Sequence, residues 1–310
     1  MAEKFLSELG ISAATDGYRH SVIFSHDDEA KVFLERELGL EEAGKLMGSR
    51  VKLWHWSHRW FKPLQKEEWW VSVAPDGAIN GFVHEFPEDA AGATLSPDSA
   101  QIIAENFLRE RMGLNLAQLE LVDKDTKQRP NRSDHTFTYK ISELNIHDAD
   151  YRYAVGVWGS TVGSFGEFLH VPEAWQRDYA KLRARNDTTG LVAAAFLFIT
   201  IFGALWFFID RARKRDVRWK TATWVAIIGG ALTFLAQLNG FNLQEFGYDT
   251  TETYTSFVVT SILQALITWR FTVCYATNSK AVTLLQSIRT PIPSSLSTIL
   301  VVIAGLIISK

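Results

Sequence analysis

Histidines and paired carboxylates are the residues in this sequence that could support metal or acid–base chemistry. All eight histidines precede residue 171, and two of them, His55 and His58, stand three positions apart in the segment WHWSHRW. Side chains three apart on a β-strand point to opposite faces, so this pair cannot bind one metal ion together. No HExxH motif, paired CxxC motif or third spaced ligand accompanies them. We therefore interpret them as strand histidines beside aromatic neighbours.

The remaining reactive motifs favour structural roles as well. Glutamate pairs occur at 41–42 and 67–68, on solvated stretches without a metal ligand at helical spacing. The segment from Arg129 to His135 reads either as an anion-binding turn or, preferably, as a salt-bridged loop. No GxSxG motif, Walker loop or dinucleotide fingerprint is present. We predict no catalytic residue, no cofactor and no metal site for this chain.

A cluster of tryptophans is the best candidate for a binding site. Five of the eleven tryptophans lie within seventeen positions, on predicted strands. A half-buried sheet face accounts for most of them. The functional alternative is a face that binds peptide or lipid headgroups. Tryptophan suits such an interface because it combines a large apolar ring with a polar N–H that can face water. The candidate residues are Trp54, Trp56, Trp60, Trp69 and Trp70.

The elements that carry these residues are duplicated. FLERELGL at 33–40 matches FLRERMGL at 107–114, and each string ends an amphipathic helix. Ser25 and Ser96 are the predicted N-caps, and Gly39 and Gly113 the predicted C-terminal glycines.

A hairpin is duplicated too. VSVAPDGAINGFVHEFPE at 71–88 matches VGVWGSTVGSFGEFLHVPE at 155–173, with turns at Pro75–Gly77 and at Gly159–Ser160. Further strands are predicted over 51–61, 119–122 and 135–141. The fold class is therefore α+β, with two repeats (1–92 and 93–178) that each lay a helix on an antiparallel sheet of three or four strands.

The C-terminal part is predicted to lie in a membrane. Residues 191–209 are nineteen uncharged residues, enough for a helix to cross about 30 Å of hydrocarbon. Six Lys and Arg residues follow within 211–220, a mark of the cytoplasmic side. We predict a juxtamembrane helix or linker at 179–190 and a membrane region at 191–310 with three to four spans, at about 191–209, 222–238, 254–276 and 294–309.

Charge distribution suggests an orientation. The loops after the first three spans hold six, zero and two Lys and Arg, which places 239–253 and residues 1–189 outside the cytoplasm. One fact conflicts with this orientation. A membrane span that follows a folded domain does not readily export that domain, and no signal peptide precedes the domain. Either an upstream segment is missing or the domain stays inside the cytoplasm. Residues 1–189 carry 22 Lys and Arg against 30 Asp and Glu, which argues against a nucleic-acid partner.

Long strings of the sequence resemble a known family. The segment FLRERMGLNLAQLELV, then RPNRSDHTFTY, the second hairpin and HVPEAW look like the region before the membrane core of bacterial CPBP-type (CAAX protease and bacteriocin-processing) intramembrane metallopeptidases. The helix-plus-sheet repeats are similar to PepSY-type modules, which accompany or inhibit peptidases. The resemblance runs from about Tyr18 to Ile267 and includes the loop GFNLQEFGYDTTETYTSF. It implies a bacterial inner-membrane protein with an extracytoplasmic domain.

The sequence also departs from that family. The family's metal chemistry, with a divalent metal such as zinc, needs a Glu-Glu-x-x-x-Arg motif and histidines on later membrane helices. This chain has no histidine after His170 and no glutamate pair after Glu68, so no catalytic residue carries over.

Three functions follow as hypotheses. The first is a membrane-anchored, noncatalytic protein whose PepSY-like domain binds a peptide or regulates a protease partner. The second is a fragment of an active peptidase whose catalytic helices lie outside a truncated or frameshifted chain. The third is a membrane scaffold. The partners implied are the lipid bilayer and a peptide or protease.

Overall fold

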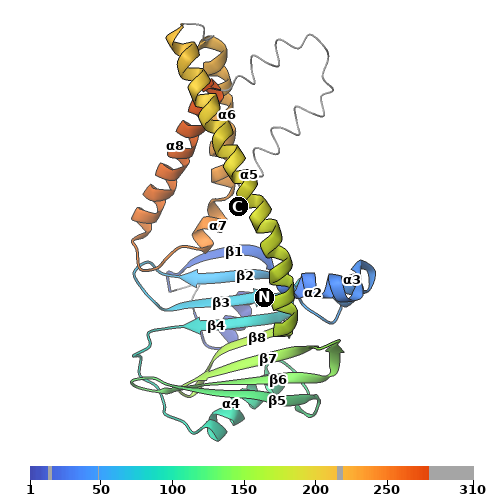
Figure 1. Cartoon of the computed structure of the whole chain (residues 1–310). Coiled ribbons are helices and arrows are strands. Elements are labelled where there is room, and N and C mark those ends of the chain that lie inside the picture. Colours follow the sequence, from blue (N-terminus) through green and yellow to red (C-terminus); the bar gives the residue numbers. More distant parts are fainter. Residues whose placement is uncertain (13–15, 48, 215–218, 279–310) are drawn as a thin grey trace. The chain divides into compact units, whose positions relative to one another are not determined.

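The computed structural model describes residues 1–12, 16–47, 49–214 and 219–278. By their contacts these residues form two compact units. The first contains residues 1–185 together with 237–263, and the second begins at Asn186. The first unit is an α+β domain, as the sequence predicts, and it is built on one antiparallel sheet of eight strands (Figure 1).

The strand order is β1-β2-β3-β4-β8-β7-β6-β5, so each half of the sheet is a meander and the two last strands, β4 and β8, meet in the middle. Both predicted hairpins are confirmed, as β3–β4 and β7–β8. Their turns contain Gly77 and Gly159 at positive φ, where glycine is favoured. The strands are β1 (Arg19–His26), β2 (Trp54–Phe61), β3 (Glu68–Val73), β4 (Ile79–Glu85), β5 (Leu119–Gln128), β6 (Ser133–Ile146), β7 (Ala149–Trp158) and β8 (Thr161–His170).

The two amphipathic helices cover one face of this sheet, whereas the short helix α7 (Phe241–Phe246) contacts β1 on the other face. The two predicted amphipathic helices are α2 (Asp28–Leu38) and α4 (Pro97–Glu110). Ser96 caps α4 as predicted, with its side chain accepting from the Ser99 N–H. The Ser25 prediction is wrong, because Ser25 lies in β1 and Asp27 caps α2 instead. The other short elements of this unit are α1 (Ala2–Glu8), α3 (Leu40–Met47), the 3₁₀ turn η1 (Leu116–Gln118) and α7 (Phe241–Phe246).

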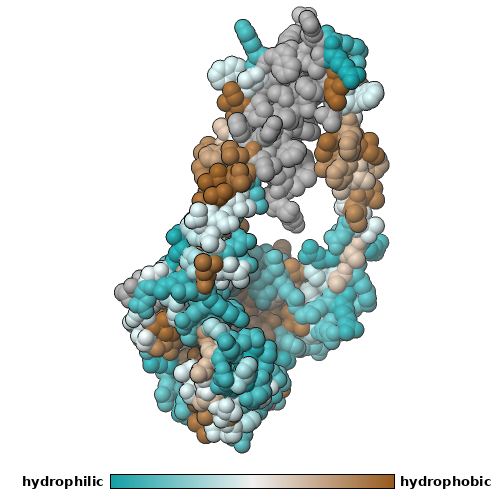
Figure 2. Space-filling model, turned by 90° about the vertical axis from the view of Figure 1, so that its left-hand side faces the viewer, coloured by the Kyte–Doolittle hydropathy of each residue, from teal (hydrophilic) through white to brown (hydrophobic). Residues whose placement is uncertain are grey.

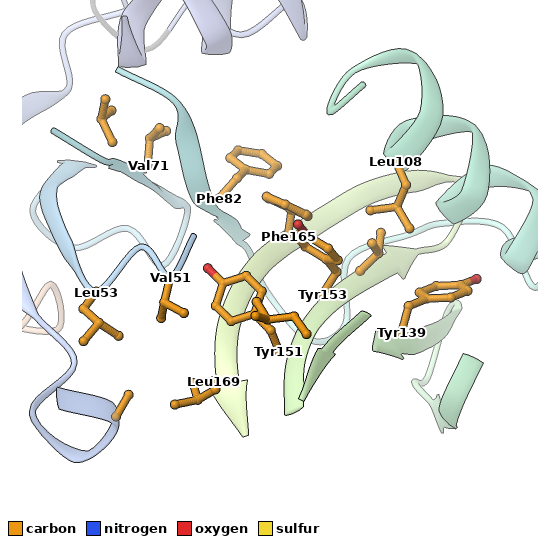
Figure 3. Close-up of a cluster of buried hydrophobic side chains, with 14 of the residues drawn as sticks. Val51, Leu53, Val71, Phe82, Leu108, Tyr139, Tyr151, Tyr153, Phe165 and Leu169 are labelled. Carbon is orange, nitrogen blue, oxygen red and sulfur yellow. The ribbon is translucent and has the colours of Figure 1, made fainter. Parts of the chain in front are cut away.

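A single hydrophobic core joins the two halves of the sheet. Val51 and Phe82 from the first half lie with Tyr151 and Phe165 from the second (Figure 3). All four side chains are at most 3% exposed. The repeats seen in the sequence are therefore halves of one folded body.

The long helices carry the apolar runs. They are α5 (Glu173–Arg213), α6 (Trp219–Asn239) and α8 (Tyr254–Asn278). The segment at 179–190, predicted as a juxtamembrane helix or linker, is part of the continuous helix α5.

The expectation of three to four spans is not met by the described residues. Among them one helical stretch, Glu173–Gly203, is long and apolar enough to cross a membrane. The apolar parts of the next two helices, Ile227–Asn239 and Tyr254–Leu266, are shorter. The span predicted at 294–309 lies outside the described residues.

Candidate polypeptide-binding face

The face of the sheet opposite the core contains a buried ion pair. In the register of β1, β2 and β3, Arg59 lies between Ser21 and Trp70, so these three residues share a face. Glu68 stands two residues before Trp70 and points the same way. We call the set Arg19, Ser21, Arg59, Phe61, Glu68 and Trp70 the docking face.

Arg59 and Glu68 are bound tightly within this face. Arg59 Nη2 and Nε lie 2.6 and 2.9 Å from Glu68 Oε2, and Trp70 Nε1 donates to Glu68 Oε1 at 3.1 Å. The two charged side chains are 6% and 9% exposed. The guanidinium carbon lies 4.7 Å from the Trp70 ring and 4.8 Å from the Phe61 ring. Pairing and hydrogen bonding make such deep burial of two charges tolerable.

The third nitrogen of Arg59 binds a distant part of the chain. Nη1 donates to the carbonyl oxygens of Phe246 at 2.7 Å and Tyr248 at 2.8 Å. These residues belong to the segment 240–254, which connects α6 to α8 and which we call the inter-helix segment. Arg59 thus recognises main-chain carbonyls, a contact that does not depend on the side chains bound.

Aromatic contacts reinforce this recognition. Phe246 meets Trp70 edge to face, with ring centroids 5.1 Å apart. Tyr248 packs on Phe61 at 5.3 Å and is only 2% exposed. Aromatic pairs in this geometry contribute about 0.5–1.5 kcal/mol beyond the area they bury.

A second arginine holds both ends of the inter-helix segment. Arg19 donates to Glu245 Oε1 at 2.7 and 3.1 Å and to the Tyr254 hydroxyl at 2.7 Å. The Tyr254 hydroxyl also donates to Glu245, at 2.8 Å. The Ser21 hydroxyl adds a hydrogen bond to the Asn242 carbonyl at 3.3 Å.

The loop between β2 and β3 supplies one more contact. The Leu64 N–H donates to the Thr250 carbonyl at 2.8 Å. Leu64 has φ 61°, a conformation that is unfavourable for a residue with a Cβ. Strain of this kind persists where the surrounding structure fixes the backbone, here beside the bound segment.

The five predicted tryptophans do not line one accessible face. Trp60 and Trp69 are buried in the core on the helix-covered side, and Trp54 is half-buried against it. Trp56 is 47% exposed and packs beside Phe24. Only Trp70 lies on the docking face, where it touches the inter-helix segment.

The histidine pair separates as the strand period requires. His58 meets His20, with His20 Nε2 and His58 Nδ1 3.0 Å apart, and both rings stack on Trp60. Burial, then His20 and the N-terminal ammonium, lower the pKa of His58 to about 4. His55 points to the other face. Among the described residues no three His, Cys, Asp or Glu side chains are placed to hold a metal ion.

The remaining motifs have structural partners. Arg129 and Arg132 both pair with Asp134, and Arg132 also donates to the carbonyl oxygens of Pro87 and Ala90. This confirms the salt-bridged loop. Glu67 contacts His84, and Lys45 pairs with both members of the 41–42 glutamate pair.

Sequence reasoning missed Arg19, Arg59 and the inter-helix segment as a site. One signal was present: residues 239–253 hold three acids and no Lys or Arg, which complements arginines on a strand. Periodicity cannot pair positions nearly 190 residues apart. Comparison of the chain with protein-family models, with curated proteins and with solved structures gives no match.

Proposed function

We propose that this protein is a membrane-anchored, noncatalytic protein whose PepSY-like sheet domain binds polypeptide and regulates a protease partner. In this proposal it corresponds to the front part of a CPBP-type intramembrane metallopeptidase. The observation that carries the proposal is the inter-helix segment bound on the docking face. A sheet that holds one segment through its carbonyl groups and two aromatic side chains has the chemistry to hold another.

Exposed apolar side chains support the membrane anchor. On α5, Phe196, Phe202 and Trp206 are 66%, 67% and 75% exposed. Figure 2 shows hydrophobic side chains gathered on the described parts of the long helices, while the sheet domain is largely hydrophilic. A bilayer would cover such side chains. We include α6 and α8 as further spans in the proposal, in the inner membrane of a bacterium.

The contact of the inter-helix segment with the docking face supports the predicted orientation as well. Because Arg19 and Arg59 bind the inter-helix segment, that segment and the sheet lie on the same side of any membrane that α6 and α8 cross. The absence of Lys and Arg from 239–253 supports a position of both outside the cytoplasm.

Competition with a synthetic peptide tests the binding function. A fluorescent peptide with the sequence of residues 240–254 should bind full-length protein carrying Tyr248→Ala, whose own segment is held less firmly. The wild-type protein should bind it more weakly, because its own segment occupies the face. Fluorescence anisotropy in detergent measures both.

Two controls define the result. A Tyr248→Ala/Arg59→Met variant should lose the peptide, since Arg59 supplies the carbonyl contacts. A Tyr248→Ala/Lys45→Met variant should keep it, because Lys45 is an exposed residue of α3. Equal binding by the two double variants would contradict the proposal.

A further inference from the structure

The seam between the two halves of the sheet is paired over a short stretch and is open on both sides of it. Strands β4 and β8 pair at three positions, from Val83 opposite Ser164 to Gly81 opposite Gly166. By contrast, β7 and β8 pair at nine positions. Past Gly81 the pairing stops, with Asn80 on one strand and Glu167 on the other.

A cavity of about 190 Å³ lies at this opening. Both halves of the sheet line it, which makes it a product of the joined repeats. Such a volume is below the roughly 300–1,000 Å³ of pockets for drug-sized ligands, so a small group fits. We call it the seam pocket, and its polar lining includes Asp27, Lys52, His55, Asn80, Tyr151 and Glu167.

The seam pocket gathers polar atoms without well-directed hydrogen bonds. Four buried side-chain polar atoms in the described part of the chain have no well-directed hydrogen bond, and three of them, on His55, Asn80 and Glu167, belong to this pocket. Of these three, the Glu167 atom is ion-paired with Lys52. Asn80 is only 6% exposed, and its Oδ1 is an acceptor. Leaving a buried acceptor of this kind without a partner is unfavourable, so a donor entering the pocket is favoured.

Glu167 is the charged centre of the pocket. Its side chain is 5% exposed, and its Oε1 lies 3.0 Å from Lys52 Nζ, an ion pair without a well-directed hydrogen bond. Burial raises the pKa of Glu167, and the nearby Lys52 opposes that shift. The Lys52 side chain is 29% exposed, so part of it already lies in solvent.

The charges favour a cation. The lining contains two acidic side chains, Asp27 and Glu167, and one basic side chain, Lys52. Burial lowers the pKa of His55, which keeps that ring neutral near pH 7. The lining therefore carries a net negative charge together with acceptors on Asn80 and Glu167. Both features suit a group with positive charge and several N–H donors.

We propose that the seam pocket binds a primary ammonium group, from either a free amine or the first residue of a peptide. The ammonium donates to Glu167 and Asn80, and Lys52 moves aside. This site uses no residue of the docking face. A negative result for ammonium binding would therefore leave the polypeptide-binding proposal intact, and a negative result for polypeptide binding would leave the ammonium site intact.

Calorimetry on the full-length protein in detergent tests the proposal with three probes. Alaninamide and trialanine both carry a free ammonium, whereas N-acetylalaninamide does not. Saturable binding of alaninamide and trialanine without binding of N-acetylalaninamide supports the site. Binding of trialanine alone assigns it to peptides, and binding of alaninamide alone assigns it to free amines. Equal binding of the acetylated probe, or no binding of either amine, overturns the proposal.

Variants locate the site. Glu167→Gln should weaken amine binding by about tenfold or more, the size expected for a lost hydrogen bond to a charged group. Asn80→Asp adds a negative charge and should strengthen binding, a gain that misfolding cannot mimic. Glu120→Gln, which alters an exposed carboxylate paired with Lys140, should change nothing. Unchanged affinity in both Glu167→Gln and Asn80→Asp would also overturn the proposal.

Discussion

Arg59 on β2 and Glu68 on β3 form a buried ion pair whose closest atoms, Nη2 and Oε2, are 2.6 Å apart. The carboxylate takes one side of the guanidinium, which leaves Nη1 directed at the carbonyl groups of Phe246 and Tyr248. A pair on adjacent strands therefore determines how a segment almost 190 residues away is held.

Loss of one member of this pair should be costly. We expect Arg59→Met to lower the free energy of unfolding by about 3–5 kcal/mol, because Glu68 is left as a buried, uncompensated charge. Denaturant unfolding followed by tryptophan fluorescence measures it. An Arg59→Met/Glu68→Leu variant should regain much of the loss. Lys45→Met, in an exposed pair, should have no measurable effect, and an equal effect of Arg59→Met and Lys45→Met would refute the prediction.

Two glycines of β8 offer a matched pair of substitutions. A Cβ on Gly163 would lie 1.9 Å from Cε3 of Trp158, whereas a Cβ on Gly166 would meet nothing within 4 Å. We expect Gly163→Ala to destabilise the protein by about 1–3 kcal/mol, as overpacking does, and to shift the tryptophan emission. Gly166→Ala should be neutral or slightly stabilising. Denaturant unfolding curves of the two variants measure this difference. Similar stabilities of the two variants would contradict the tight packing of Trp158 against Gly163.

His58 should make stability depend on pH. Burial, together with His20 and the N-terminal ammonium, lowers its pKa to about 4, while the unfolded chain titrates near 6.5. Below pH 6.5 the unfolded chain binds the proton first, so stability present above pH 6.5 is lost as the pH falls toward 4.

The variant His58→Gln should lose less stability over that range than the wild type. Denaturant unfolding at pH 7, 5.5 and 4.5 gives the slope for each protein. His147→Gln, at an exposed position, serves as the control and should keep the wild-type slope. A His58→Gln slope as steep as the wild-type slope would show that this residue is not responsible.

Cysteine labelling tests the membrane orientation. In a Cys274→Ser background, cysteines at Glu120 and Asp249 should react with an impermeant reagent added to intact cells. A cysteine at Lys214 should react only after the membrane is opened. Labelling of Lys214→Cys from outside, or of the first two only from inside, would reverse the orientation.

Local pattern determined several of the individual elements of this protein. The repeated strings ending at Leu40 and Leu114 mark two helices, because apolar residues at helical spacing must share a buried face. Glycines at 77 and 159 mark the hairpin turns, because each adopts positive φ. The two-residue period of a β-strand is enough to predict that His55 and His58 point to opposite faces.

Tertiary structure decided how these elements meet. The pairing of β4 with β8 merges the two repeats into one sheet and creates the seam pocket. Packing buries Trp60 and Trp69 and leaves Trp70 on the docking face. The contact of Arg59 with Tyr248 joins residues 189 positions apart, and a pattern that repeats every two or 3.6 residues holds no information about such a pair.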